Sequence, residues 1–470
     1  MFASVLLLLI GGWFAAPAGA AENDGHPALG EKLPWISVAP FAAVLLAIAA
    51  MPLAAPHWWE RNRNKAIVMA ALAGPMALYL VAAWGGEGAH QLLDKLREYV
   101  SFIVLLGALF VICGGIYIQG SFSGTPLVNT GFIAAGTLLA SFIGTTGASM
   151  VLIRPLLRAN ESRQRVVHVV IFFIFAVSNC GGLLTPLGDP PLFLGFLNGV
   201  PFEWTFRLWP QWLFVNGCLL VVFHVWDQVM LNREELERPG SQLEELLHHP
   251  PVYIRGLRNL WFLGGVIATI YCSGEGLGNG GERWPFGVAE GVMLALAAAS
   301  YVITPQVAHA GNRFAFGPII EVAVLFAGIF VTMTPALLIL NVHGPELGLR
   351  QPWQYFWTTG VLSSFLDNAP TDLTFAATAA GDAGIPLNPG YLGEFLAQPA
   401  AKSPDAILAA ISCGAVFMGA NTYIGNGPNF MVKAIAEQHN IRMPGFFAYM
   451  LYSSCLLLPL FALATVLFFR

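Results

Sequence analysis

With 470 residues and a net charge of −5, the chain has the length of several soluble domains. Its composition excludes an ordinary soluble enzyme, because 56% of the residues are hydrophobic, only 10% are charged, and the mean hydropathy is +0.66. Its 22 Lys and Arg form no dense run, which excludes a nucleic-acid-binding protein. The expected partner is the lipid bilayer.

The common sequence motifs of ATP-driven pumps, hydrolases and zinc enzymes are absent from the sequence. It holds no phosphate-binding loop, no GxSxG elbow and no HExxH zinc motif. We therefore expect a protein that is not an enzyme, has no cofactor and draws its energy from an ion gradient.

The first 21 residues have a short apolar core followed by small residues, which predicts a signal peptide. The alternative is an uncleaved membrane anchor. In either case residue 25 is expected on the periplasmic side of a bacterial inner membrane.

Apolar stretches divide the rest of the chain into two similar halves. The first half, residues 30–228, is predicted to contain helices 36–54, 66–84 and 99–119, a hairpin 129–158, a broken helix 166–200 and a helix 210–228. A polar cytoplasmic linker, 229–258, follows. The second half, 259–470, is predicted to contain helices 259–274, 287–303 and 317–341, a hairpin 353–380, a broken helix 405–438 and a helix 444–469. The predicted fold class is an all-α polytopic membrane protein with about ten transmembrane helices and two re-entrant hairpins.

The distribution of positive charge supports the first hairpin. If 129–158 entered and left on one side, 14 Lys and Arg would lie inside and eight outside, as the positive-inside rule requires. A full crossing would instead place the arginine-rich stretch 154–165 outside.

Short matches indicate that the halves are an inverted repeat. Residues 141–143 resemble 364–366, and Asn179 and Pro186 match Asn421 and Pro428 at one shared offset. Inverted repeats with broken helices are typical of secondary transporters, whose sites lie at the breaks. Irregular backbone persists at membrane depth only where protein, water or a ligand satisfies it.

Candidate ion- or substrate-binding residues gather at these four interruptions. They are Ser141, Thr145 and Thr146 in the first hairpin; Ser178, Asn179, Thr185 and Asp189 in the first broken helix; Ser363, Ser364, Asp367, Asn368 and Thr371 in the second hairpin; and Asn421, Thr422, Asn426 and Asn429 in the second broken helix. Their side chains offer hard oxygen ligands of the kind that suit sodium.

Two carboxylates are the proton-carrying candidates, because ionisable groups at membrane depth are costly and are functional by default. Asp367 is the first choice and Asp189 the second. Asp189 has an alternative role as a helix N-cap, since Pro190 follows it. Asn421, Asn426 and Asn429 of the second broken helix have an alternative role as interhelical hydrogen-bonding groups.

Several other polar residues have simpler explanations. Asp372 is expected near solvent, Asp227 and Glu290 at solvated span ends, and His168 in a satisfied core position. Glu321 is expected to pair with Arg, to cap a helix or to serve a proton path.

The stretches SNCGGLLTPLGDPPLFLGFL, SSFLDNAPTDLTF and GANTYIGNGPNF resemble the ion transporter superfamily, specifically its citrate transport and NhaD-type sodium:proton antiporter branch. The resemblance covers nearly the whole chain after the first segment. It implies a homodimer in which a mobile part carrying both hairpins and both broken helices moves elevator-fashion against a scaffold. It also implies sodium binding through Asp367, Asn368 and Asn179, with Asp189 taking part in ion handling.

One departure from the antiporter pattern keeps a second function open. That pattern has an acidic Asp-Asn element in the first hairpin, where this chain has Thr145-Thr146. The first hypothesis is sodium:proton antiport, and the alternative is sodium- or proton-coupled uptake of citrate or another small carboxylate. A third hypothesis, a non-transporting membrane protein, conflicts with the mirrored breaks.

Overall fold

The computed structural model describes residues 29–240, 252–398 and 403–470, so the predicted signal peptide and part of the predicted linker lie outside the described residues. The first half contains α2 (Leu29–Lys32), η1 (Trp35–Val38), α3 (Ala39–Ala54), α4 (Pro56–Trp59), α5 (Asn62–Gly114), β1 (Tyr117–Gln119), α6 (Pro126–Ile143), α7 (Thr145–Ala159), α8 (Val167–Ala176), η2 (Cys180–Leu183), α9 (Pro190–Leu197), η3 (Phe202–Leu208) and α10 (Trp209–Glu237).

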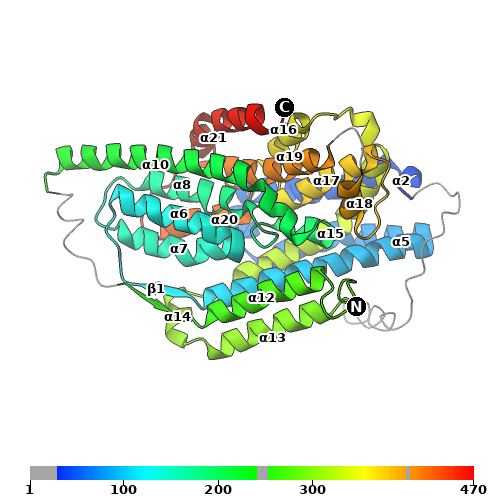
Figure 1. Ribbon diagram of the computed structural model, residues 1–470, viewed down its shortest axis with the longest axis horizontal. Coiled ribbons are helices and arrows are strands. Elements are labelled where there is room, and N and C mark those ends of the chain that lie inside the picture. Colours follow the sequence, from blue (N-terminus) through cyan, green and yellow to red (C-terminus); the bar gives the residue numbers. More distant parts are fainter. Residues whose placement is uncertain (1–28, 241–251, 399–402) are drawn as a thin grey trace.

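The second half has a similar order of elements (Figure 1). It contains β2 (Tyr253–Arg255), α12 (Asn259–Gly274), α13 (Val288–Ile303), α14 (Gln306–Gly311), α15 (Gly317–Val342), η4 (Gly344–Leu347), α16 (Pro352–Ser363), α17 (Asn368–Asp382), α18 (Tyr391–Ala397), α19 (Pro404–Met418), η5 (Gly419–Asn421), α20 (Gly427–Gln438) and α21 (Phe446–Phe468). The short strands β1 and β2 pair antiparallel and so connect the two halves.

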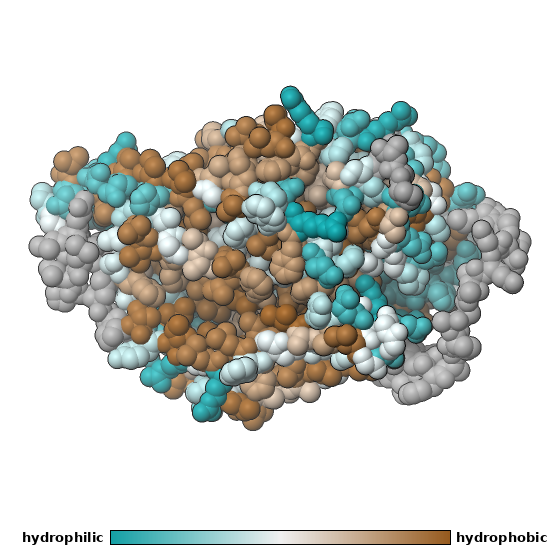
Figure 2. Space-filling model, in the orientation of Figure 1, coloured by the Kyte–Doolittle hydropathy of each residue, from teal (hydrophilic) through white to brown (hydrophobic). Residues whose placement is uncertain are grey.

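The prediction of an all-α polytopic membrane protein is confirmed. Within the described part of the chain, seven helices are long and apolar enough to cross a membrane, and three shorter apolar helices, 167–183, 259–274 and 288–303, coincide with further predicted spans. On α10, Val221, Val222, Val225 and Val229 are exposed, as expected for side chains that face lipid. Figure 2 shows hydrophobic residues over much of the visible surface.

The predicted spans 66–84 and 99–119 lie in two helices that share the label α5 and are separated by a kink at Gly85. Gly85 has φ 55° and ψ −128°, a conformation that glycine adopts without steric cost. The second helix begins before the predicted span and ends at Gly114, so the polar residues just before residue 99 are helical.

The helices α5 and α15 pack along each other through aromatic side chains. The ring of Phe102 lies 4.7 Å from that of Phe326 and 5.9 Å from that of Phe330. About one turn earlier on α15, Glu321 Oε1 lies 2.7 Å from Nζ of Lys65, which belongs to the part of α5 that precedes Gly85. Glu321 thus pairs with a lysine, where the sequence analysis considered an arginine.

Both predicted hairpins are present as pairs of helices with irregular tips. In the first, α6 and α7 meet at Gly144, whose φ of 79° favours glycine. In the second, α16 and α17 are separated by residues 364–367. The tips therefore expose backbone groups that need partners.

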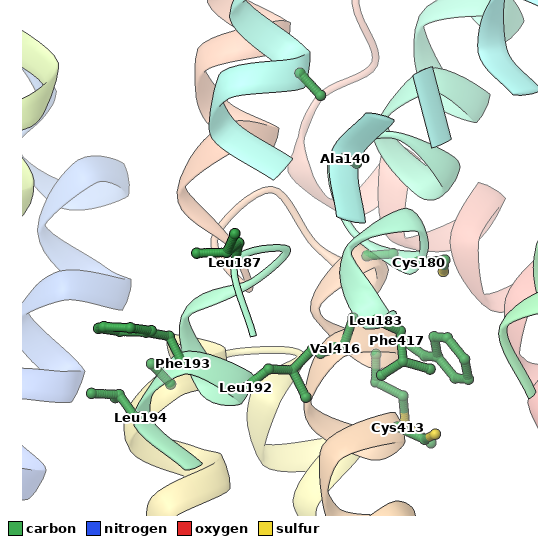
Figure 3. Close-up of a cluster of buried hydrophobic side chains, with 14 of the residues drawn as sticks. Ala140, Cys180, Leu183, Leu187, Leu192, Phe193, Leu194, Cys413, Val416 and Phe417 are labelled. Carbon is green, nitrogen blue, oxygen red and sulfur yellow. The ribbon is translucent and has the colours of Figure 1, made fainter. Parts of the chain in front are cut away.

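Both predicted broken helices are also present, as α8–η2–α9 and α19–η5–α20. In the first, Gly181 and Gly182 allow a close backbone approach, because a Cβ on Gly181 would lie 2.6 Å from the carbonyl oxygen of Thr137. Apolar side chains surround the break, and Figure 3 shows Leu183 and Leu192 beside Val416 and Phe417 of α19. The polar groups of the break are therefore enclosed by apolar side chains.

Candidate ion-binding site

The first hairpin is fastened to the first broken helix by two hydroxyl groups. Ser141 Oγ donates to the carbonyl oxygen of Gly181 (2.5 Å) and accepts from the backbone N–H of Leu184 (3.2 Å). Thr185 Oγ1 donates to the carbonyl of Ser141 and accepts from the N–H of Leu187 (3.1 Å). Both side chains therefore satisfy backbone groups freed by the break.

The second half repeats this arrangement. Thr422 Oγ1 donates to the carbonyl of Ser364 (2.5 Å) and accepts from the N–H of Ile424 (3.1 Å). Ser364 Oγ donates to the carbonyl of Met418 (3.2 Å) and accepts from Asn421 Nδ2 (2.9 Å). Like their counterparts in the first half, these side chains support the irregular backbone.

The recurring contacts correct the residue pairing inferred from sequence. They pair Thr185 with Thr422, so Asp189 pairs with Asn426, whereas the sequence match paired Asn179 with Asn421. Asp189 and Asn426 are the N-cap residues of α9 and α20, which begin the second half of each broken helix. The division into two inverted repeats stays a prediction, and these contacts are the observation in its favour.

Asp189 lies where all four interruptions meet. Its side chain is buried, at 2% exposure. Its Oδ1 accepts from Thr145 Oγ1 at the first hairpin tip (2.8 Å) and from Asn426 Nδ2 (3.3 Å). Its Oδ2 accepts from Asn368 Nδ2 at the second hairpin tip. One carboxylate thus joins both hairpins and the second broken helix.

The capping role considered for Asp189 is wrong. Asp189 occupies the N-cap position of α9, but its side chain accepts no hydrogen bond from that helix. An N-cap side chain bonds the N–H of the second or third helical residue; the second, Pro191, has none, which leaves only that of Leu192. The Pro190-Pro191 pair therefore weakens the capping role without excluding it, and the bonds from Thr145, Asn368 and Asn426 show what the carboxylate binds instead.

Asp367, the first choice from sequence, has the capping role instead. Its carboxylate accepts from the N–H of Ala369 (3.2 Å) at the start of α17, and the side chain is half-buried. Thr371 Oγ1 bonds the carbonyl of Asp367 (2.8 Å), and Ser363 Oγ bonds that of Ala415 (2.6 Å). The second hairpin therefore presents Asn368, rather than Asp367, to Asp189.

A second polar layer joins the two broken helices. Asn179 Nδ2 donates to Asn429 Oδ1 (2.7 Å), and Asn429 Nδ2 donates to the carbonyls of Gly419 and Thr422 (both 2.9 Å). Asn426 Nδ2 also reaches the carbonyl of Ser178 (3.2 Å). The expected interhelical role of these amides is therefore observed, beside the central carboxylate.

Several buried acceptor oxygens near this cluster have no hydrogen-bond partner. Among the residues that the structure describes, they include Oδ1 of Asn179, Asn368, Asn421 and Asp372. Asp372 is 2% exposed, which contradicts its expected contact with solvent. Buried acceptors of this kind are rare in proteins, and these oxygens are available to accept a hydrogen bond or to bind a cation.

A small cavity of about 60 Å³ adjoins the first hairpin tip. Thr145 and Thr146 line it on one side, and Leu106 of α5 and Ile319 of α15 line it on the other. Thr145 and Thr146 are thus predicted site residues at the boundary between the hairpin and the α5–α15 pair. Thr145 Oγ1 also donates to Asp189 Oδ1, so the cavity adjoins a residue of the central cluster.

Sequence reasoning missed one buried ionic network. Asp227 is fully buried and binds Arg163 (2.7 Å), His168 (2.8 Å) and Asn129 (2.9 Å). Its expected position at a solvated span end is therefore wrong, whereas His168 is a satisfied core histidine as predicted. The partners come from separate elements, so no local spacing revealed them.

Comparison with known proteins agrees with this architecture. A family model described as "Putative citrate transport" matches residues 30–469. The chain belongs to this family. A protein of Synechocystis sp. named as an uncharacterized transporter is 27% identical over 338 residues, which cover 67% of this chain and 70% of that protein. The chain is therefore a multi-pass membrane protein of a transport family, rather than an enzyme.

Proposed function

We propose that the protein is a secondary transporter that exchanges sodium ions for protons at Asp189. The observation that carries this proposal is the environment of the carboxylate. It is buried at 2% exposure, and its hydrogen-bond donors Thr145, Asn368 and Asn426 are all neutral. A buried charge without a counter-charge is unfavourable, so a proton or a metal cation must neutralise it.

Sodium has a suitable set of oxygen ligands in this cluster. The carboxylate of Asp189 supplies charge, and the unpartnered Oδ1 of Asn368 supplies an uncharged oxygen on the opposite hairpin. Asn179 Oδ1 is a further unpartnered oxygen in the adjoining layer. Hard cations prefer such oxygen ligands. Asp189 thus takes the central position that the sequence resemblance gave to Asp367.

Exchange follows if one carboxylate binds either a proton or a sodium ion, but not both. Occupation by either cation neutralises the buried charge and permits the hairpins and broken helices to move as one body. The tip of the first hairpin meets α5 and α15 across mainly apolar side chains, including Leu106, Phe110 and Ile319. Apolar contacts of this kind allow sliding, so elevator-type movement within a homodimer of the bacterial inner membrane is part of the proposal.

Sodium- or proton-coupled carboxylate uptake is the second candidate. It is favoured by the description of the matching family and by the two half-helix N-termini at Asp189 and Asn426, which attract anions. However, no Arg, Lys or His donates a hydrogen bond to Asp189, Asn368 or Asn426 in the part of the chain that the structure describes. This neutral donor set favours the cation.

Transport by the purified protein in sealed liposomes distinguishes the two functions. Sodium is added outside liposomes that contain a trapped pH dye, and uptake of radiolabelled citrate is measured on the same preparation. Antiport predicts sodium-dependent proton movement without citrate. Citrate uptake that requires sodium or protons, with no proton movement in the absence of citrate, would establish the second function and contradict the first.

A further inference from the structure

Arg154 on α7 carries a guanidinium group with unusually few partners. Its Nε and Nη1 atoms are buried and have no hydrogen-bond partner. Arg154 lies nine residues after Thr145, or about 14 Å along the helix at about 1.5 Å per residue. It therefore lies far from the hydrogen bonds around Asp189 and is not explained by the proposed ion exchange.

The charges that act on Arg154 are positive. Arg158, one helical turn later, and Arg313, in the connection between α14 and α15, both lie within electrostatic range of Arg154. Arg158 donates to the carbonyls of Ile118 (2.5 Å) and Gly120 (3.3 Å), which carry no net charge. None of the three arginines forms an ion pair with an acidic residue described by the structure.

Packing at the end of α5 explains how these arginines come together. A Cβ on Gly114 would lie 2.3 Å from the ring of Phe314 and 3.1 Å from Met150 Cε. Met150 precedes Arg154 by one turn of α7, and Phe314 directly follows Arg313. These contacts bring the segments that carry Arg154 and Arg313 together where the first hairpin meets the end of α5.

We propose that Arg154, Arg158 and Arg313 bind an oxyanion, either a carboxylate or a phosphate group, at the base of the first hairpin. Like charges placed close together repel, and buried guanidinium nitrogens without a partner, as Nε and Nη1 of Arg154 are, are costly. An oxyanion removes both costs, because its paired oxygens match the fork of N–H donors on arginine. The anion comes either from solution, as citrate or inorganic phosphate, or from the headgroup of an anionic lipid in the expected cytoplasmic leaflet.

Binding to the full-length protein tests the proposal and separates the two sources. In one arm, inorganic phosphate and citrate are titrated into delipidated protein in a neutral detergent by calorimetry. In the other, retention of phosphatidylglycerol is measured by native mass spectrometry. The variants are Arg154→Gln and Arg313→Gln, and the control is Arg350→Gln, an exposed arginine at the start of the second hairpin.

We expect both cluster variants to weaken binding of the soluble anion or of the lipid at least tenfold, while the control matches the native protein. Arg313 is exposed, so its substitution preserves the test if Arg154→Gln does not fold. Equal binding by all three variants, or no binding of any probe by the native protein, would overturn the proposal.

Discussion

Replacing Asp189 with Asn preserves the size of the side chain and removes its charge. The native carboxylate is buried at 2% exposure and accepts bonds from Thr145, Asn368 and Asn426. With an effective dielectric constant of about 20, a unit charge about 4 Å from a cation contributes about 4 kcal/mol. Because about 1.4 kcal/mol corresponds to a factor of ten, we expect sodium affinity to fall about a thousandfold.

The assay measures sodium-dependent proton movement in liposomes over a range of sodium concentrations. Native protein and Asp189→Asn are reconstituted at equal density, and thermal unfolding in detergent establishes that the variant is folded. We expect the variant to match protein-free liposomes at every concentration at which the native protein is active. A folded variant with the native half-saturating sodium concentration would refute the assignment of Asp189.

A second variant tests whether the position of the charge matters. Asn426 has the equivalent place in the other broken helix, and its Nδ2 lies 3.3 Å from Asp189 Oδ1. Combining Asn426→Asp with Asp189→Asn returns one carboxylate to the same cluster. We expect this double variant to recover part of the exchange, so activity no higher than that of Asp189→Asn alone would contradict the shared site.

Three further changes test the surrounding structure. Asp367→Ala removes the cap of α17 and is expected to lower the free energy of unfolding by about 1 kcal/mol. Asp367→Asn keeps a capping group, and we expect it to keep sodium-dependent exchange. Loss of exchange in the Asn variant would return the ion-binding role to Asp367. Gly144→Ala places a side chain on a residue with φ 79° and is expected to lower the free energy of unfolding by about 1–2 kcal/mol. The control is Gly131→Ala on α6, where a Cβ meets open space, and we expect it not to destabilise the protein. Asp227→Asn leaves buried Arg163 without its charge partner and is expected to cost about 3–5 kcal/mol; an unchanged melting temperature would contradict the importance of this network.

The spans and interruptions were predictable because they depend on local properties. Apolar runs, Gly and Pro determine where a chain crosses the bilayer and where a helix breaks, and both hairpins and both broken helices lie at the predicted places. The helical state of the polar residues between Gly85 and residue 99 was not predictable from hydropathy, because they have the composition of a surface loop.

The roles of the two carboxylates depended on the residues that follow each one. Ala369 has the N–H that Asp367 caps, whereas Pro191 has none and leaves Asp189 only the N–H of Leu192. The sequence therefore favoured the distinction without deciding it, and the Asp-Asn pair at the hairpin directed attention to Asp367. The network around Asp227 depends on contacts between distant elements, and no local pattern encodes it.

The central cluster combines similar geometry in the two halves with unequal charge. Thr145 and Asn368 both reach the carboxylate from hairpin tips, and Asp189 and Asn426 both begin half-helices, yet Asp189 alone among these four is ionisable. A second carboxylate at position 426 would lie close to the first, and like charges at that distance would repel strongly in a buried site. Asn426 instead donates a neutral hydrogen bond to Asp189, and this favours the proposed binding of one monovalent cation at Asp189.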